Sequence, residues 1–151
     1  MEFISWLLVQ NKIQCKTNHL LKNIVVNADC EFWNSGAESP DHLILHCPFA
    51  IKCWAAFRIE IQSDASVTRL WEPGRPQNIP AAFYSTYLLL CSWQLWKHWH
   101  DVIFGAMEPS LIRLMLCFKE KAHLSCCRLP RSDQISARAS VNYSLSICRH
   151  L

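Results

Sequence analysis

Residues 30–50, which read CEFWNSGAESPDHLILHCPFA, carry the most informative spacing in this chain of 151 residues. A complete small zinc site of this layout reads C-x2-C, then a short loop, then H-x4-C. Cys30, His42 and Cys47 fill three of the four positions, and Trp33 stands where the second cysteine is expected. Structural zinc is held by four thiolate or imidazole ligands in a tetrahedron. The spacing therefore predicts a metal-binding loop in which one ligand is replaced.

The fourth ligand is the open question of this loop. An indole offers only an N–H donor, so Trp33 cannot bind a metal ion. His46 follows His42 by four residues, and a helical turn would place both rings on one face. We therefore take His46 as the candidate substitute ligand. The alternative is that Cys30 and Cys47 are buried thiols and that no ion is bound, and spacing alone leaves both interpretations open.

Turn and capping residues predict the local structure around this loop. Ser39 is a suitable N-cap and Pro40 a suitable first helical residue for a short turn that carries His42. Thr17 can cap a second helix whose buried side would be Leu20, Leu21 and Ile24. Further helices are expected over residues 3–8, from Pro48, over 81–104 and over 110–126.

The composition favours a packed, mainly helical protein. Apolar residues make up 51% and charged residues 18%, and three glycines are too few for many tight hairpins. We expect short helices that brace a small zinc-knuckle-like loop, then a long two-helix unit and a loose C-terminal tail. The corresponding division is a zinc-binding module over 1–58, a linker over 59–80, a helical unit over 81–127 and a basic flexible tail over 128–151.

Nine cysteines form an odd set, and the apolar start of the chain lacks the basic residues of a secretory signal. We therefore expect a reducing, intracellular location, in the nucleus or the cytoplasm. The apolar window over 81–96 is slightly short for a membrane span and contains polar residues. It predicts a buried core helix, and no membrane partner or small-molecule substrate is expected.

Positive charge is concentrated in the C-terminal third. From Arg113 onward there are seven Lys or Arg residues and two acidic ones. Such residues contact phosphates, and the candidates for nucleic-acid contact are Lys97, Arg128 and Arg131. Trp93, Trp96 and Trp99 have helical spacing, which favours core packing over base stacking, with Trp99 as the exception because polar residues flank it.

Together these residues resemble the zinc-binding region near the C-terminus of reverse transcriptases from plant non-LTR (LINE-type) retrotransposons. Cys30 matches the first ligand of that region. Glu38-Ser39 with His42-Leu43 matches its E-S/T-x-x-H-L step, and His46-Cys47-Pro48 with Trp54 matches its closing segment. A downstream element over 95–104 is also similar, but Trp99-His100 stand where that family typically has Arg-Asn.

The resemblance implies a retrotransposon-derived zinc-knuckle segment that contacts RNA or DNA. It implies no catalysis, because the chain has no Asp-Asp step that would hold the two metal ions of a polymerase. Zinc is the implied cofactor, with Trp33 in place of one ligand. The alternative function is a degenerate, metal-free helical remnant or a protein-interaction module without activity of its own.

Overall fold

The computed structural model describes residues 2–30, 32, 36–72 and 74–146 and is mainly helical within them. The helices are α1 (Glu2–Val9), α2 (Lys16–Leu21), the π-helical turn η1 (His42–His46), α3 (Pro48–Ala56), the 3-10 turn η2 (Val67–Arg69), α4 (Ala81–Gly105), α5 (Leu111–Cys126) and α6 (Arg131–Ser146). Within the described ranges, β pairing is limited to one isolated bridge, between Asp29 and Ala37. The expected mainly helical class is therefore confirmed.

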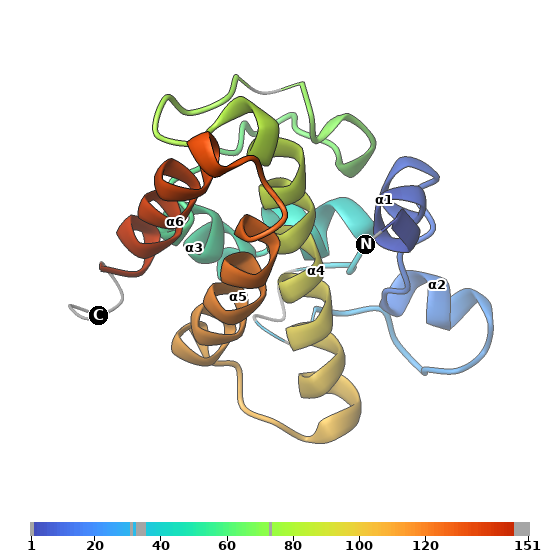
Figure 1. Cartoon of the computed structure of the whole chain (residues 1–151). Coiled ribbons are helices and arrows are strands. Elements are labelled where there is room, and N and C mark those ends of the chain that lie inside the picture. Colours follow the sequence, from blue (N-terminus) through green and yellow to red (C-terminus); the bar gives the residue numbers. More distant parts are fainter. Residues whose placement is uncertain (1, 31, 33–35, 73, 147–151) are drawn as a thin grey trace.

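The long helix α4 runs through the middle of the molecule (Figure 1). In that view α5 and α6 lie to its left, and α1 and α2 lie to its right. Helix α4 packs along α5, and α5 packs in turn against α6. The first half of α4 is apolar on most sides, and the sequence therefore predicts a buried helix. Neighbouring elements cover it on several faces.

An aromatic cluster joins α3, α4 and α5. The ring of Phe57 lies 4.6 Å from that of Phe118 and 6.3 Å from that of Tyr87, measured between centroids. All three side chains are fully buried, and the Tyr87 hydroxyl donates to the Phe57 carbonyl at 3.1 Å. Aromatic pairs in such tilted and edge-on arrangements stabilise a core beyond their buried area.

Helix ends follow the local chemistry of the sequence. The Ser110 hydroxyl accepts from the Arg113 amide and caps α5, and Pro48 opens α3. Asn23, just beyond α2, has a φ of 55°, a left-handed conformation that asparagine tolerates at helix ends. The predicted helix start at Pro48 is confirmed, but the predicted capping of α2 by Thr17 is wrong. Thr17 lies inside that helix, whose N-cap is Cys15 and has no side-chain capping bond.

The predicted buried face of α2 is wrong. The side chains of Leu20, Leu21 and Ile24 are 40%, 82% and 56% exposed. The residues before the helix are buried instead, with Ile13 and Cys15 fully covered. Helix α2 is thus anchored by its N-terminal end, and its apolar C-terminal residues extend into solvent.

The prediction of a loose C-terminal tail is also wrong for residues 131–146, because these residues form α6. Ala137 and Val141 are fully buried and one helical turn apart, on the side that packs against α5. The Ser140 hydroxyl donates to the Asn78 carbonyl, so α6 also holds the segment before α4. Small apolar residues give α6 a narrow contact stripe that is hard to recognise in a Ser- and Arg-rich sequence.

The segment over 59–80 is mostly irregular, but it contributes Val67, Leu70 and Ile79 to the core. Whether its ends delimit separate units remains a prediction. In the described part of the chain, no helix combines the length and the apolar character needed to cross a membrane.

Candidate metal centre

Cys30 is positioned by a short pairing between two segments of the loop. The Cys30 amide donates to the Gly36 carbonyl at 3.1 Å, and the Glu38 amide donates to the Ala28 carbonyl at 2.7 Å. Gly36 has a φ of 93°, which a residue with a side chain rarely adopts. This pairing places the Cys30 thiol in the core beside the start of η1.

His42 and Cys47 are brought together by the π-helical turn. The Ser39 hydroxyl accepts from the His42 amide at 3.1 Å, as the predicted N-cap requires. The Cys47 amide then donates to the His42 carbonyl at 2.6 Å, five residues back. Such wide turns occur mostly as single insertions and frequently at functional sites. The Trp54 indole, fully buried below the turn, donates to the Ile44 carbonyl at 2.6 Å and stabilises it.

The three predicted ligands meet. One ligand atom from each of Cys30, His42 and Cys47 lies within 4.8 Å of the other two. The two Sγ atoms are 3.6 Å apart, which is too long for a disulfide of about 2.05 Å. Zn–S bonds of about 2.3 Å in a tetrahedron place two sulfurs about 3.8 Å apart. The spacing of the thiols therefore fits two ligands of one zinc ion.

His42 supplies a further observation in favour of an ion. Its Nε2 is buried, and within the described residues it has no hydrogen-bond partner. Buried polar side-chain atoms are nearly always satisfied, so each exception calls for an explanation. A zinc ion between the two sulfurs and this nitrogen would take up the lone pair. The residues present therefore fit the metal that their spacing predicts.

The environment of the thiols has consequences for metal uptake. The pKa of Cys47 is raised by its hydrogen bond with the Cys30 thiol and, next, by burial. Without a metal ion, the thiol form is therefore favoured at neutral pH. A zinc ion reverses this preference because it binds the thiolate, so metal binding releases protons and weakens as the pH falls.

Among the described residues, the ligand group consists of Cys30, His42 and Cys47, and the predicted fourth ligand does not join it. His46 lies outside the ligand group, and its Nε2 is 2.7 Å from the Ala65 carbonyl oxygen. The geometry therefore offers no support for His46 as a ligand. Trp33, the residue in the missing ligand position, lies outside the described residues.

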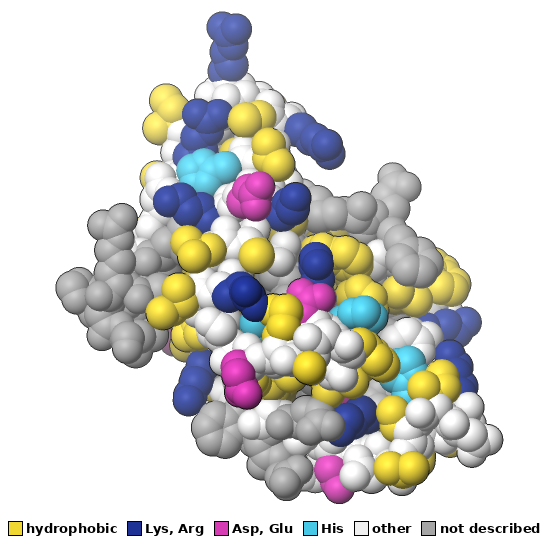
Figure 2. All heavy atoms as spheres, turned by 90° about the horizontal axis from the view of Figure 1, so that it is seen from below, with side chains coloured by type: hydrophobic (Ala, Val, Ile, Leu, Met, Phe, Trp, Pro, Cys, Tyr) yellow, Lys and Arg dark blue, Asp and Glu magenta, His cyan; other side chains and the backbone are white. Residues whose placement is uncertain are grey.

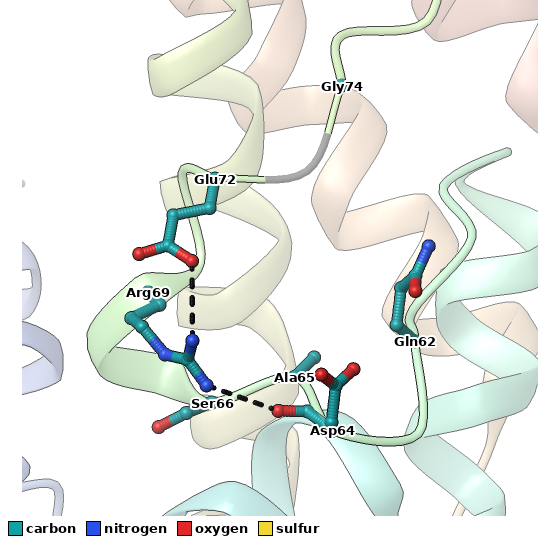
Figure 3. Close-up of a pocket in the computed structure, with 7 residues that line it drawn as sticks. All are labelled: Gln62, Asp64, Ala65, Ser66, Arg69, Glu72 and Gly74. Carbon is teal, nitrogen blue, oxygen red and sulfur yellow. Dashed lines mark hydrogen bonds and ion pairs between the residues drawn. The ribbon is translucent and has the colours of Figure 1, made fainter.

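The contact of His46 belongs to a set that fastens the segment over 62–72 to η1. The Asp41 carboxylate accepts from the Ser66 hydroxyl at 3.1 Å and from the Val67 amide at 2.7 Å. Figure 3 shows the shallow pocket on this segment, where Arg69 reaches Glu72 at 3.6 Å and the Asp64 carbonyl at 3.5 Å. Because these oxygens already engage Arg69, the pocket does not present an unopposed cation to an anionic ligand.

Glu38 is a buried residue of the site that sequence reasoning missed. Its carboxylate accepts from the Lys16 amide and from the Trp99 indole, each at 2.8 Å. Burial raises the pKa of Glu38 to about 7, although both hydrogen bonds act in the opposite direction. This one side chain therefore joins the metal loop to α2 and to α4.

Stacked rings form a second link to α4, which the spacing of residues along the chain does not predict. Phe32 stacks on Phe49 at 4.7 Å, and Phe49 stacks on His98 at 5.4 Å. The Nε2 of His98 accepts from the Ser110 amide at 2.9 Å, and burial lowers the pKa of His98. Both observations indicate a neutral imidazole that packs beside the metal loop.

The residues predicted to contact nucleic acid lie apart from the ligand group. Lys97 is an exposed residue of α4 and pairs with Asp101 at 3.8 Å. Arg128 and Arg131 are exposed at the junction of α5 and α6. Trp99, which its polar sequence neighbours set apart from core packing, is instead fully buried, and its indole donates to the Glu38 carboxylate.

A comparison with known families addresses the N-terminal part of the chain. Residues 1–54 match the family model described as zinc-binding in reverse transcriptase. These residues are a reverse transcriptase zinc-binding region. No curated protein and no solved structure matches the chain.

The match covers the segment that contains Cys30, His42 and Cys47, so family and geometry agree on the metal. The predicted retrotransposon-type zinc-binding region and its zinc cofactor are thereby confirmed at the level of the family. The match is to a zinc-binding region and not to a polymerase catalytic domain.

Proposed function

We propose that this protein is a non-catalytic zinc-knuckle segment that contacts RNA or DNA inside the cell. The observation that carries the proposal is the convergence of two thiols and an unpartnered imidazole nitrogen in a reverse transcriptase zinc-binding region. The ion would act as a structural cross-link. It would tie the Cys30 loop to η1 and so fix the shape of the N-terminal region.

The nucleic-acid contact is supported by the charge of α5 and α6. Six basic residues stand over 111–146 against Glu120 and Asp133, and all six are exposed: Arg113, Lys119, Lys121, Arg128, Arg131 and Arg138. Figure 2 shows Lys and Arg side chains gathered in the upper part of the underside. Exposed cations of this kind neutralise phosphates, and they position a nucleic acid without reading its sequence.

Metal content tests the first part of the proposal. Native mass spectrometry of the purified chain should show one zinc ion per molecule. Cys47→Ser should lose the ion, whereas Cys117→Ser, at an exposed thiol on α5, should retain it. A wild-type mass equal to that of the bare polypeptide, even after incubation with zinc, would overturn the proposed metal centre.

Salt-dependent binding tests the second part. Wild-type protein should bind labelled RNA or DNA with an affinity that falls as salt rises, because each phosphate contact releases counterions. Replacing Arg128 and Arg131 by Gln should weaken binding and flatten the salt dependence. Arg69→Gln removes an exposed cation of η2, outside α5 and α6, and should change neither. Equal affinity of all three proteins would contradict contact through α5 and α6.

A metal-free remnant that binds another protein is the second candidate. Trp33 in a ligand position favours it, and so do Ile112, Leu116 and Leu124, which are exposed apolar residues of α5. In that case the chain would take up no zinc, even after incubation with the metal. The same mass measurement therefore separates the two candidates.

A further inference from the structure

A row of aromatic rings runs along the second half of α4. Trp96, His100 and Phe104 are spaced four residues apart, so their side chains lie one above another on the helix. The ring of Trp96 is 5.8 Å from that of His100, which is 4.8 Å from that of Phe104. His100 is exposed, Phe104 is 51% exposed and Trp96 is half-buried. We call these three residues the α4 aromatic row.

The row is held in place from beneath by contacts with the N-terminal region. The Trp96 indole donates to the Gln14 carbonyl at 3.0 Å. His19 meets Phe104 edge-on at 5.8 Å, and the buried Trp99 meets it edge-on at 6.1 Å. These contacts hold the rings of the row on their inner side. A ring that is already held in place loses little conformational entropy when a ligand stacks on it.

Positive charge lies beside the row. The Lys22 ammonium donates at 3.3 Å to the side-chain carbonyl of Gln14, the residue whose backbone carbonyl accepts from Trp96. Lys97 follows Trp96 directly and forms an exposed ion pair with Asp101, which is the acidic residue of α4. Exposed pairs of this kind are weak, so Lys97 can exchange its partner for a phosphate at little cost.

This side of the molecule is open to a ligand. In Figure 1, α4 descends to the lower end of the molecule, so its last turns reach the face that Figure 2 shows from below. On that face, histidine side chains lie among hydrophobic ones, with Lys or Arg beside them. Aromatic rings next to cations are the combination that binds unpaired nucleotides, because bases stack on the rings and phosphates meet the charges.

We infer that the α4 aromatic row is a base-stacking site for a single-stranded nucleic acid. The ring spacing excludes a duplex as the stacking partner. Bases of a duplex strand follow one another about every 3.4 Å and are covered by their neighbours, whereas the rings of the row are 5.8 and 4.8 Å apart and tilted by 44° and 47°. A strand with unstacked, splayed bases can place a base on the exposed side of a ring. The inference rests on the proposed function, which it narrows to unpaired strands.

Binding of three nucleic acids to purified, zinc-supplemented full-length protein tests the inference. The probes are a labelled oligouridine, the oligothymidine of equal length and a duplex of equal length, at one salt concentration. Wild-type protein should bind both single strands more tightly than the duplex. Preference for the RNA or the DNA strand would identify which nucleic acid the site takes.

Substitutions at Phe104 distinguish base stacking from nonspecific hydrophobic binding. Phe104→Ala and Phe104→Leu should both weaken single-strand binding by about fivefold or more, because each removes a stacking ring. Phe104→Trp should restore or increase it. Leu124→Ala, at a residue of α5 that is 60% exposed, is the matched control and should change nothing. Duplex binding should be the same for all four variants.

The failures of this inference and of the proposed function are distinguishable. If Phe104→Ala and Phe104→Leu bind single strands as wild type does, while loss of Arg128 and Arg131 weakens binding, the stacking site is refuted and nucleic-acid contact stands. Equal affinity of wild-type protein for duplex and single strands refutes it as well. If no probe binds at all, both the stacking site and the proposed nucleic-acid contact are refuted.

Discussion

Glu38 makes the stability of this protein depend on pH in a way that can be calculated. The carboxyl group is fully buried, and its pKa is raised from 4.5 to about 7, with burial as the main cause. The difference of about 2.5 in pKa corresponds to about 3 kcal/mol of unfolding free energy, at about 1.4 kcal/mol for each pKa unit.

The sign follows from proton binding. Between about pH 4.5 and 7 the folded state keeps the proton on Glu38, whereas the unfolded chain has released it. The folded state therefore binds more protons in this range, and stability falls as the pH rises. The contribution is fully present below about pH 4.5 and is lost by the time the pH has passed through 7.

Urea unfolding of reduced protein in excess EDTA, at a series of pH values from 4 to 8, measures this contribution. Chelation removes the separate pH dependence of metal binding. Glu38→Gln is the comparison because an amide does not titrate in this range. It retains one acceptor oxygen for the Lys16 and Trp99 donors, so the weakened hydrogen bonding should add a pH-independent cost of about 1 kcal/mol to its unfolding free energy.

The difference between the two proteins isolates Glu38. His19 and His98 have lowered pKa values, mainly because of burial, and so make stability rise with pH, but they are present in both proteins. Relative to wild type, Glu38→Gln should gain about 3 kcal/mol between pH 4.5 and 7.5. Parallel pH curves for the two proteins would show that the buried carboxyl does not titrate as described, and would refute the reasoning.

Three further predictions concern single sites. Ala106 ends α4 with a φ of 50°, a strained conformation for a residue with a side chain; Ala106→Gly should raise the unfolding free energy by about 1 kcal/mol in urea titrations, and a decrease would contradict the strain. Phe118→Ala should cost about 3–5 kcal/mol in the same measurement because it empties the centre of the aromatic cluster, and a loss below 1 kcal/mol would show that the core collapses around it. Trp33→Cys restores the C-x2-C spacing and should raise zinc affinity at least tenfold in competition with a chelator; unchanged affinity would show that residue 33 does not face the ion.

The ligand group could be predicted from the sequence because its chemistry is local. A thiol followed by an H-x4-C step can close around one ion over a short loop, and Cys30, His42 and Cys47 do converge. His46 was proposed because residues four apart on a helix share a face, but that spacing does not reveal a competing partner. Its Nε2 lies 2.7 Å from the carbonyl oxygen of Ala65, 19 residues further along the chain.

Long-range packing explains the remaining differences. Trp99 has polar sequence neighbours, but its own direction on α4 is set by the acceptor Glu38, 61 residues away in the sequence. Helix α6 was overlooked because its contact stripe consists of small residues such as Ala137 and Val141, which leave little hydrophobic signal. In both cases the deciding partner is distant in the sequence, and periodicity within one segment does not reveal it.

The hydrogen bond between Glu38 and Trp99 determines how the N-terminal region can be isolated. The stretch recognised by the family ends at residue 54, which is inside α3. A fragment trimmed there would interrupt that helix and leave the Glu38 carboxylate without its indole donor. Peptides meant to reproduce the zinc-binding region should therefore extend at least through α4. Poor folding of a shorter peptide would result from the loss of these contacts.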